Sequence, residues 1–182
     1  MNKVLNFPNI LTISRIALIP AIATAFYMNY STIVFIVFAF CCLTDFLDGY
    51  IARAYKQTTR FGQVLDPISD KALIATTIIF IVWFHEISML SMIPASLILC
   101  REVMVSEVRG IVISEKKKFK TTKIAKWKTT FQMLSLGFIT FSRIFDYNGV
   151  IVITGEVFLW IASVMAIVSG ASYYRRHFDF FL

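Results

Sequence analysis

The sequence predicts an all-α integral membrane protein, built as a bundle of six transmembrane helices. Two observations predict this class. First, 58% of the 182 residues are hydrophobic and only 16% are charged, with a mean hydropathy of +0.72, whereas a soluble domain is about 45–50% apolar and about 25% charged. Second, the apolar residues form long continuous runs rather than short alternating ones. The same composition excludes a disordered chain, which would be polar and highly charged.

Six apolar runs reach the length of about 20 residues that a helix needs to cross a bilayer. We expect the spans at about residues 10–29, 31–50, 67–84, 89–109, 127–145 and 150–172. Lipid cannot satisfy backbone polar groups, so each span is expected to be a helix. Neither a repeat nor a linker divides the sequence, so residues 1–182 are expected to form a single membrane domain. Residues 1–7 are at best a short amphipathic segment, compatible with a place on the membrane surface.

Positively charged residues are distributed unevenly among the connections. The connection between the second and third spans and the one between the fourth and fifth are rich in lysine and arginine, and the C-terminus adds Arg175 and Arg176. The other three connections contain one arginine, Arg143. The positive-inside rule therefore predicts a multi-pass protein of the cell (inner) membrane with both termini and both basic loops in the cytoplasm. Membrane lipids are expected partners, and nucleic acid is not.

Four aspartates lie at the end of the second expected span and the start of the third: Asp45, Asp48, Asp66 and Asp70. Carboxylates at membrane depth are costly, so they usually serve a function. Each pair is spaced by three or four residues and therefore shares one helix face. Asp66 and Pro67 are typical of a helix N-cap and first turn, so the third helix is expected to begin there. Two antiparallel helices would then each present two carboxylates toward one point, near the cytoplasmic interface.

Four converging carboxylates repel one another unless cations neutralise them. Oxygen ligands suit Mg²⁺, Mn²⁺ or Ca²⁺, and four of them favour a two-metal site of the kind used for phosphoryl chemistry. Gly49 permits close approach of a ligand, and Arg53 could hold a phosphate with two hydrogen bonds. Two alternatives remain open from these residues: a surface network that pairs the acids with Arg53, Arg60 and Lys71, and a cation or proton transporter.

The aspartates also belong to a longer pattern with eight fixed residues at fixed gaps. The pattern reads Asp45-x2-Asp48-Gly49-x2-Ala52-Arg53-x8-Gly62-x3-Asp66-x3-Asp70. It resembles the full signature of the CDP-alcohol phosphotransferases, a family whose members have six spans and the signature at the end of the second. The resemblance favours a metal-dependent membrane transferase over a divalent-cation transporter.

Further residues are similar to one branch of this family, the phosphatidylglycerophosphate synthases. They are Asn9, Thr12 and Arg15 near the start, Arg101-Glu102 with Ser106 and Arg109 in the fourth span, and Lys126, Lys128, Thr129 and Gln132 in the fifth. Ala125 departs from the branch, which usually has glycine there. The resemblance implies transfer of the phosphatidyl group of CDP-diacylglycerol to sn-glycerol 3-phosphate, giving phosphatidylglycerophosphate and CMP in phospholipid biosynthesis. Inositol phosphate, serine or phosphatidylglycerol as the acceptor are the alternatives.

The resemblance also implies roles for individual residues. Asp45, Asp48, Asp66 and Asp70 would bind two Mg²⁺ or Mn²⁺ ions, and Asp70 would also act as general base on the acceptor hydroxyl. The residues that would bind CDP-diacylglycerol are Gly49, Arg53, Thr59, Asn9 and Thr12. The family is commonly homodimeric, so a homodimer is expected.

A basic pocket for the acceptor phosphate is expected from Arg101, Arg109, Lys126 and Lys128. Arg101 lies inside an apolar span, where a guanidinium needs a partner, and Arg109 follows eight residues later on nearly the same helix face. Glu102 projects about 100° away around the helix, so it is expected to be a poor partner for Arg101. As an alternative, Arg101 pairs with one of the aspartates or extends to the membrane interface.

Overall fold

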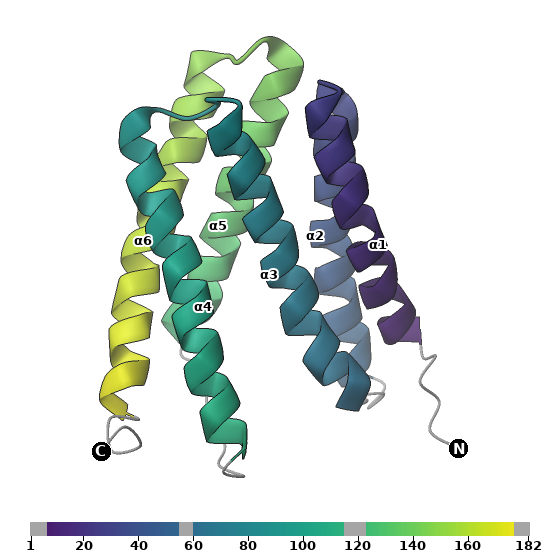
Figure 1. Cartoon of the computed structure of the whole chain (residues 1–182), viewed down its shortest axis with the longest axis vertical. Helices are drawn as coiled ribbons and strands as arrows, with labels where there is room; N and C mark the ends of the chain where they lie inside the picture. Colours follow the sequence, from purple (N-terminus) through teal and green to yellow (C-terminus); the bar gives the residue numbers. More distant parts are fainter. Residues whose placement is uncertain (1–6, 55–59, 115–122, 177–182) are drawn as a thin grey trace. The chain divides into compact units, whose positions relative to one another are not determined.

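The computed structural model describes residues 7–54, 60–114 and 123–176, and within these ranges the chain contains helices and no strand (Figure 1). The α-helices are α1 (Phe7–Tyr27), α2 (Ser31–Ala54), α3 (Arg60–Trp83), α4 (Met92–Ser114), α5 (Lys123–Ser142) and α6 (Gly149–Arg176). Two short 3-10 helices, η1 (Met89–Ser91) and η2 (Arg143–Phe145), precede α4 and α6. The prediction of an all-helical protein is confirmed. Of the segment expected on the membrane surface, residues 1–6 lie outside the described ranges.

Within the described residues, three stretches are long and apolar enough to cross a membrane. They are Asn9–Tyr27, Met89–Glu107 and Gly149–Arg175, and Ser31–Leu47 of α2 is a shorter apolar stretch. These helices define a membrane protein, because about 20 apolar residues in a row match the thickness of the hydrocarbon core. Helices α3 and α5 begin with several charged residues, which shorten their apolar parts. The prediction of six spans therefore stays a prediction.

The third helix begins earlier than the sequence predicted. Helix α3 starts at Arg60, so Asp66 and Pro67 lie inside it and not at its N-cap and first turn. A proline inside a helix removes one backbone hydrogen bond, but the preceding turn contains Gln63 and Leu65, which favour helix. The capping pattern describes only a local preference, and here the helix continues through it.

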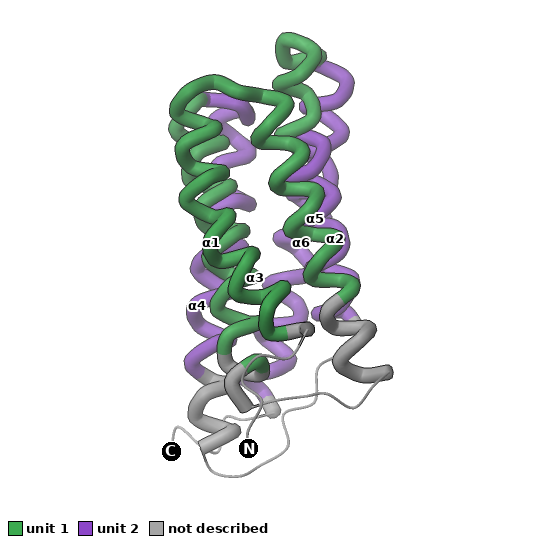
Figure 2. The backbone as a smooth tube through the Cα atoms, turned by 90° about the vertical axis from the view of Figure 1, so that its right-hand side faces the viewer, with its two compact units in different colours: residues 1–84, 140–148 green, residues 85–139, 149–182 purple. Residues whose placement is uncertain are grey.

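The chain divides into two compact units, coloured separately in Figure 2. Unit 1 comprises residues 1–84 and 140–148 and contains α1, α2, α3 and η2. Unit 2 comprises residues 85–139 and 149–182 and contains η1, α4, most of α5, and α6. In unit 1, α1 packs against both α2 and α3, and in unit 2, α4 packs against α6.

Aromatic rings pack together in unit 1. The ring of Phe26 stacks on Phe80 with centroids 5.3 Å apart, and lies 6.4 Å from Phe84. The buried guanidinium of Arg143 lies 4.8 Å from the Phe26 centroid and 5.5 Å from that of Phe84, within the range of a cation–π contact. Arg143 also donates to Asn29 Oδ1 at 3.3 Å. Asn29 has a φ of 57°, a left-handed conformation that asparagine tolerates, and it turns the chain from α1 into α2.

In unit 2, α5 and α6 approach closely at Gly155. Ser135 Oγ donates to the carbonyl oxygen of Gly155 at 2.7 Å. A Cβ at residue 155 would lie only 2.7 Å from Ile139 Cγ1 and 3.2 Å from the Ser135 carbonyl oxygen. A side chain at this position would therefore force the two helices apart.

Candidate active site

Helix α1 buries three polar residues among its apolar ones. Asn9, Thr12 and Arg15 follow one another at intervals of three, which makes them neighbours on the helix surface. Each of the three is at most 2% exposed. A buried guanidinium is costly unless anionic groups contact it, so this side of α1 requires acidic partners from other helices.

The acidic partners of Arg15 come from both α2 and α3. One guanidinium nitrogen, Nη1, donates to Asp45 Oδ1 at 2.8 Å and to Asp70 Oδ1 at 2.5 Å. The same nitrogen donates to Ser69 Oγ at 3.1 Å. The carboxylates of Asp45 and Asp70 therefore meet at one point, in agreement with the convergence that their spacing predicts. Their side chains stay 26% and 33% exposed, so they remain accessible to a ligand.

A third aspartate is held by the same face of α1. Thr12 Oγ1 donates to Asp66 Oδ1 at 2.6 Å. Ser69 Oγ donates to the backbone carbonyl of Asp66 at 2.9 Å, which links the Asp66 turn to the hydroxyl that accepts from Arg15. Thr12 was expected to bind the nucleotide, and in the structure its hydroxyl contacts Asp66, a carboxylate of the signature. Asn9 lies one turn earlier in α1 and is 2% exposed.

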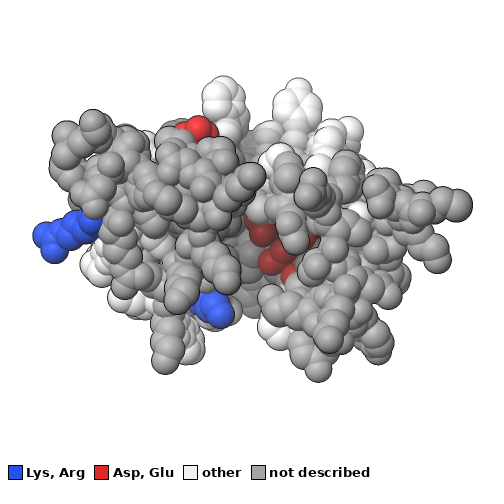
Figure 3. All heavy atoms as spheres, turned by 90° about the horizontal axis from the view of Figure 1, so that it is seen from below, with Lys and Arg blue, Asp and Glu red and all other residues white. Residues whose placement is uncertain are grey.

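The structure gives only backbone positions for several residues of the signature. Asp48, Gly49 and Arg53 belong to the last turns of α2, but their side chains lie outside the described residues, as does Thr59 altogether. The roles expected for them stay predictions. Figure 3 views the molecule from below and shows acidic side chains on this face among residues that the structure does not describe.

The donor set of the acidic site suits a hard divalent cation. The carboxylates of Asp45 and Asp70 converge, are partly exposed, and offer oxygen alone, which is the donor that Mg²⁺ and Mn²⁺ prefer. Among the residues with described side chains, no three His, Cys, Asp or Glu residues lie close enough to hold a metal ion. The signature adds Asp48 to the set, and the side chain of Asp48 lies outside the described residues. The residues present therefore fit a divalent cation by their chemistry.

No role at the acidic site was expected for Arg15 from the sequence. The expected cationic partners, in the alternative of a surface network, were Arg53, Arg60 and Lys71, and the side chains of Arg53 and Arg60 lie outside the described residues. The available signal was a single arginine within the first apolar run, three residues after a threonine. A charge in such a run needs a partner, and the aspartates are the strongest candidates.

A second group of charged residues lies in unit 2. Arg101 Nη2 donates to Ser169 Oγ of α6 at 3.0 Å, and its Nη1 lies 3.7 Å from Glu102 Oε2. Lys128 of α5 also pairs with Glu102, and Lys128 is only 1% exposed. One carboxylate of unit 2 is therefore shared by two cations.

The expectation that Glu102 is a poor partner for Arg101 is wrong. Both side chains are long enough to bend toward each other although their Cβ atoms point apart, but 3.7 Å is an ion-pair distance rather than a hydrogen bond. Of the four cations expected around the acceptor, the structure brings together Arg101 and Lys128. Lys126 is exposed, because residues two apart on a helix point to different sides.

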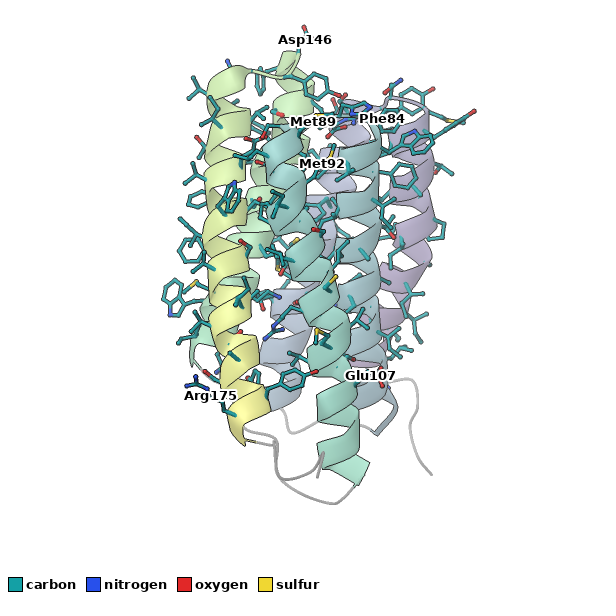
Figure 4. The ribbon with its side chains drawn as sticks, turned by 60° about the vertical axis from the view of Figure 1, so that its left-hand side comes forward. Phe84, Met89, Met92, Glu107, Asp146 and Arg175 are labelled. Carbon is teal, nitrogen blue, oxygen red and sulfur yellow. The ribbon has the colours of Figure 1, made fainter. Side chains whose placement is uncertain are left out.

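The side chain of the fourth expected cation, Arg109, lies outside the described residues, and its backbone belongs to α4. Figure 4 shows the two ends of unit 2: Glu107 and Arg175 lie at one end, and Met89 and Met92 lie at the other. Since Arg109 follows Glu107 by two residues, its backbone lies near the end where α6 reaches Arg175.

Comparison with known proteins identifies the family. The family model described as CDP-alcohol phosphatidyltransferase matches residues 5–168 and so extends over residues of both units. The chain belongs to this family. The resemblance drawn from the aspartate signature is therefore confirmed.

The relatives define the branch. A protein from Rickettsia felis named CDP-diacylglycerol–glycerol-3-phosphate 3-phosphatidyltransferase is 40% identical over 93% of this chain and 94% of its own length. Proteins of the same name from Haemophilus influenzae and Pectobacterium atrosepticum are 38% and 33% identical, and each alignment covers 92% of this chain and 91% or 92% of the relative. The similarity therefore extends over nearly the whole length of each protein.

Proposed function

We propose that this protein transfers the phosphatidyl group of CDP-diacylglycerol to sn-glycerol 3-phosphate, giving phosphatidylglycerophosphate and CMP. The main observation in support is the convergence of Asp45 and Asp70, two residues of the family signature, on one nitrogen of Arg15. The shared name of relatives at 33–40% identity supports the choice of donor and acceptor. The protein is then a phospholipid-synthesising transferase of a bacterial type.

The four aspartates of the signature, Asp45, Asp48, Asp66 and Asp70, hold two divalent cations, Mg²⁺ or Mn²⁺. When bound, the ions neutralise the diphosphate of the donor and stabilise the negative charge that develops on CMP. Two observations support this. The converging carboxylates offer oxygen donors alone, and Asp66 accepts a hydrogen bond from Thr12. These contacts with α1 orient the carboxylates before any ligand arrives.

Asp70 acts as the general base. Its carboxylate takes the proton from the acceptor hydroxyl while the hydroxyl oxygen forms a bond to the β-phosphorus of the donor. The bond between that phosphorus and the oxygen of CMP breaks, and CMP leaves with the electron pair. The contact between Asp70 and Arg15 keeps the base oriented.

The nucleotide part of the donor is bound by residues of α1, of the end of α2 and of the connection that follows. These residues are Gly49, Arg53, Thr59, Asn9 and Thr12. Arg53 supplies a charge for the diphosphate, and Gly49 leaves room for the ligand to approach the helix. The buried positions of Asn9 and Thr12 beside the aspartates support their part in this site.

The acceptor phosphate is bound by basic residues of unit 2, namely Arg101, Arg109, Lys126 and Lys128. The support is that Lys128 is buried and that Arg101 is largely buried, since two buried cations favour an anionic ligand. Glu102 keeps both cations in position between reaction cycles. A phosphate dianion would take over part of their hydrogen-bonding capacity.

The protein has six membrane spans, forms a single membrane domain over residues 1–182 and assembles as a homodimer. Its active site faces the cytoplasm, as do both termini. The support for this topology is the alternation of lysine- and arginine-rich connections with connections that have few such residues. Accessibility of cysteines introduced near the N-terminus and among residues 115–122 tests the orientation.

An acceptor screen tests the proposal. Purified protein is incubated with CDP-diacylglycerol and Mg²⁺, and each candidate acceptor is added separately while lipid products are identified by mass. We expect glycerol 3-phosphate to give phosphatidylglycerophosphate with stoichiometric release of CMP. Faster reaction with inositol phosphate, serine or phosphatidylglycerol would contradict the acceptor and leave only the family assignment.

A further inference from the structure

Arg15 is the central residue of the acidic site in the described structure. Its side chain is completely buried, and a single nitrogen contacts the carboxylates of Asp45 and Asp70 and the hydroxyl of Ser69. All these residues belong to unit 1, and they come from three different helices. No role was expected for this arginine from the aspartate signature, which begins thirty residues later.

The arrangement implies that Arg15 compensates a specific repulsion. Two carboxylates that meet at one point repel each other strongly in a partly buried site. A guanidinium keeps its charge at every relevant pH, and one nitrogen of Arg15 contacts both acids at once. Arg15 therefore holds α2 and α3 together through their acids, and the Ser69 hydroxyl fixes the direction of its nitrogen.

The same charge acts against a metal ion. A divalent cation that binds Asp45 and Asp70 must share their oxygens with a guanidinium at hydrogen-bond distance, and like charges repel. Arg15 stabilises the two carboxylates when no metal is bound. By thermodynamic linkage, less free energy is then gained when the metal binds. A buried arginine at this position thus makes the metal-free site more stable and the bound metal easier to release.

We propose that Arg15 is a positioning residue that serves as the protein's own counter-cation: it holds Asp45 and Asp70 in place when metal is absent, and it weakens the binding of divalent cations. This inference rests on the metal site of the proposed function. The consequence for the enzyme is a site that stays assembled while ions and the CMP product exchange. The role differs from that of a catalytic residue, because Arg15 acts through the two aspartates.

The test compares metal binding and stability in Arg15→Gln, Arg15→Lys and wild type, all as full-length protein in lipid nanodiscs. Mn²⁺ binding is followed by electron paramagnetic resonance, and the unfolding midpoint is measured in EDTA and in saturating Mn²⁺. We expect Arg15→Gln to bind Mn²⁺ at least about fivefold more tightly, because a positive charge has been removed beside the ligands. Its midpoint should fall more in EDTA than in Mn²⁺, whereas Arg15→Lys should stay close to wild type in both measurements.

Ser14→Ala is the matched control, since Ser14 is the neighbouring residue of α1 and its hydroxyl donates only to the carbonyl of Leu11 in the described contacts, at 2.8 Å. It should change neither Mn²⁺ affinity nor the difference between the two midpoints. An equal fall of the Arg15→Gln midpoint in EDTA and Mn²⁺, with unchanged Mn²⁺ affinity, overturns the inference and leaves Arg15 a packing residue.

A double variant decides the case in which Arg15→Gln cannot be purified without metal. If the defect is uncompensated charge, Asp45→Asn in the same chain should restore the metal-free protein, because one of the two repelling carboxylates is removed. Failure of the double variant to restore it overturns the inference. If wild type itself binds no Mn²⁺, the metal part of the proposed function fails, and this inference fails with it. If wild type and Arg15→Gln both bind Mn²⁺ with the same affinity, this inference fails and the proposed metal site stands.

Discussion

The two units balance buried charge in opposite ways. In unit 1, one cation, Arg15, contacts two carboxylates, Asp45 and Asp70. In unit 2, one carboxylate, Glu102, contacts two cations, Arg101 and Lys128. The charges of both clusters are largely buried within helices, where a charge without a partner is costly. The chain has therefore placed an acid-rich cluster in one unit and a base-rich cluster in the other.

The difference indicates what each unit can bind. An acid-rich cluster favours additional cations, and a base-rich cluster favours an anion. The proposed reaction requires both, because metal ions must meet the donor diphosphate and the acceptor brings a phosphate dianion. Arg15 and Glu102 then have comparable roles. Each carries the one charge of opposite sign in its cluster and keeps that cluster assembled before ligands bind. Changes to either cluster should have effects that the other cluster does not show.

Removal of divalent cations should have the largest effect, and it tests the acid-rich cluster. Activity should fall to background in EDTA and return with Mg²⁺ or Mn²⁺, because the carboxylates and the donor diphosphate are all anionic. Zn²⁺ should restore little, since the expected ligands are hard oxygen donors. CMP release under each metal measures this. Full activity in a chelated preparation would remove the two-metal site from the mechanism.

Asp70→Asn should have the next largest effect. The amide cannot accept the proton of the acceptor hydroxyl, so kcat should fall about 10²-fold or more, the usual scale for loss of a general base. The KM for CDP-diacylglycerol should change much less. Asp146→Asn is the control, because Asp146 is an exposed turn residue with a φ of 50°, which asparagine tolerates. Near-normal turnover of Asp70→Asn would contradict the assignment.

Arg101→Ala tests the base-rich cluster. We expect the KM for glycerol 3-phosphate to rise about tenfold, since one charged hydrogen-bond donor to the phosphate is lost. The KM for CDP-diacylglycerol should stay nearly constant, and added sulfate should compete with the acceptor alone. Lys126→Ala removes an exposed member of the same proposed group of cations, and it should raise the KM for glycerol 3-phosphate less. Loss of donor affinity in Arg101→Ala would instead move this residue to the nucleotide site.

The stability of unit 2 gives a smaller and independent measure of the same cluster. Lys128→Met removes a buried cation from Glu102, and breaking a buried pair costs about 3 kcal/mol of unfolding free energy. Lys126→Met, two residues away and exposed, should change it by less than about 0.5 kcal/mol. Thermal unfolding in detergent compares the two. Equal effects would mean that the pair between Lys128 and Glu102 contributes no stability.

Much of this organisation could be predicted from the sequence, because its signals are local. Long apolar runs indicate helices, and spacings of three and four indicate which aspartates share a face. The partners of Arg15 and Lys128 could not be predicted in this way, because contacts between helices depend on how each helix is rotated about its axis. For the same reason Lys126 and Lys128 seemed equivalent in sequence, whereas one is exposed and the other is 1% exposed. The start of α3 was missed because a capping pattern reports a preference of one turn only.

The smallest expected effect concerns the packing that supports the base-rich cluster. Gly155→Ala would place a Cβ 2.7 Å from Ile139 Cγ1 and 3.2 Å from the Ser135 carbonyl oxygen, so α5 and α6 must separate slightly. We expect a loss of about 1–2 kcal/mol of unfolding free energy and only a small change in activity. Gly149→Ala is the matched control, because nothing lies within 4 Å of a Cβ there, and a gain of about 0.5 kcal/mol is expected at this helix start. If both variants unfold at the same temperature, the close approach of α5 and α6 at Gly155 is not what holds unit 2 together.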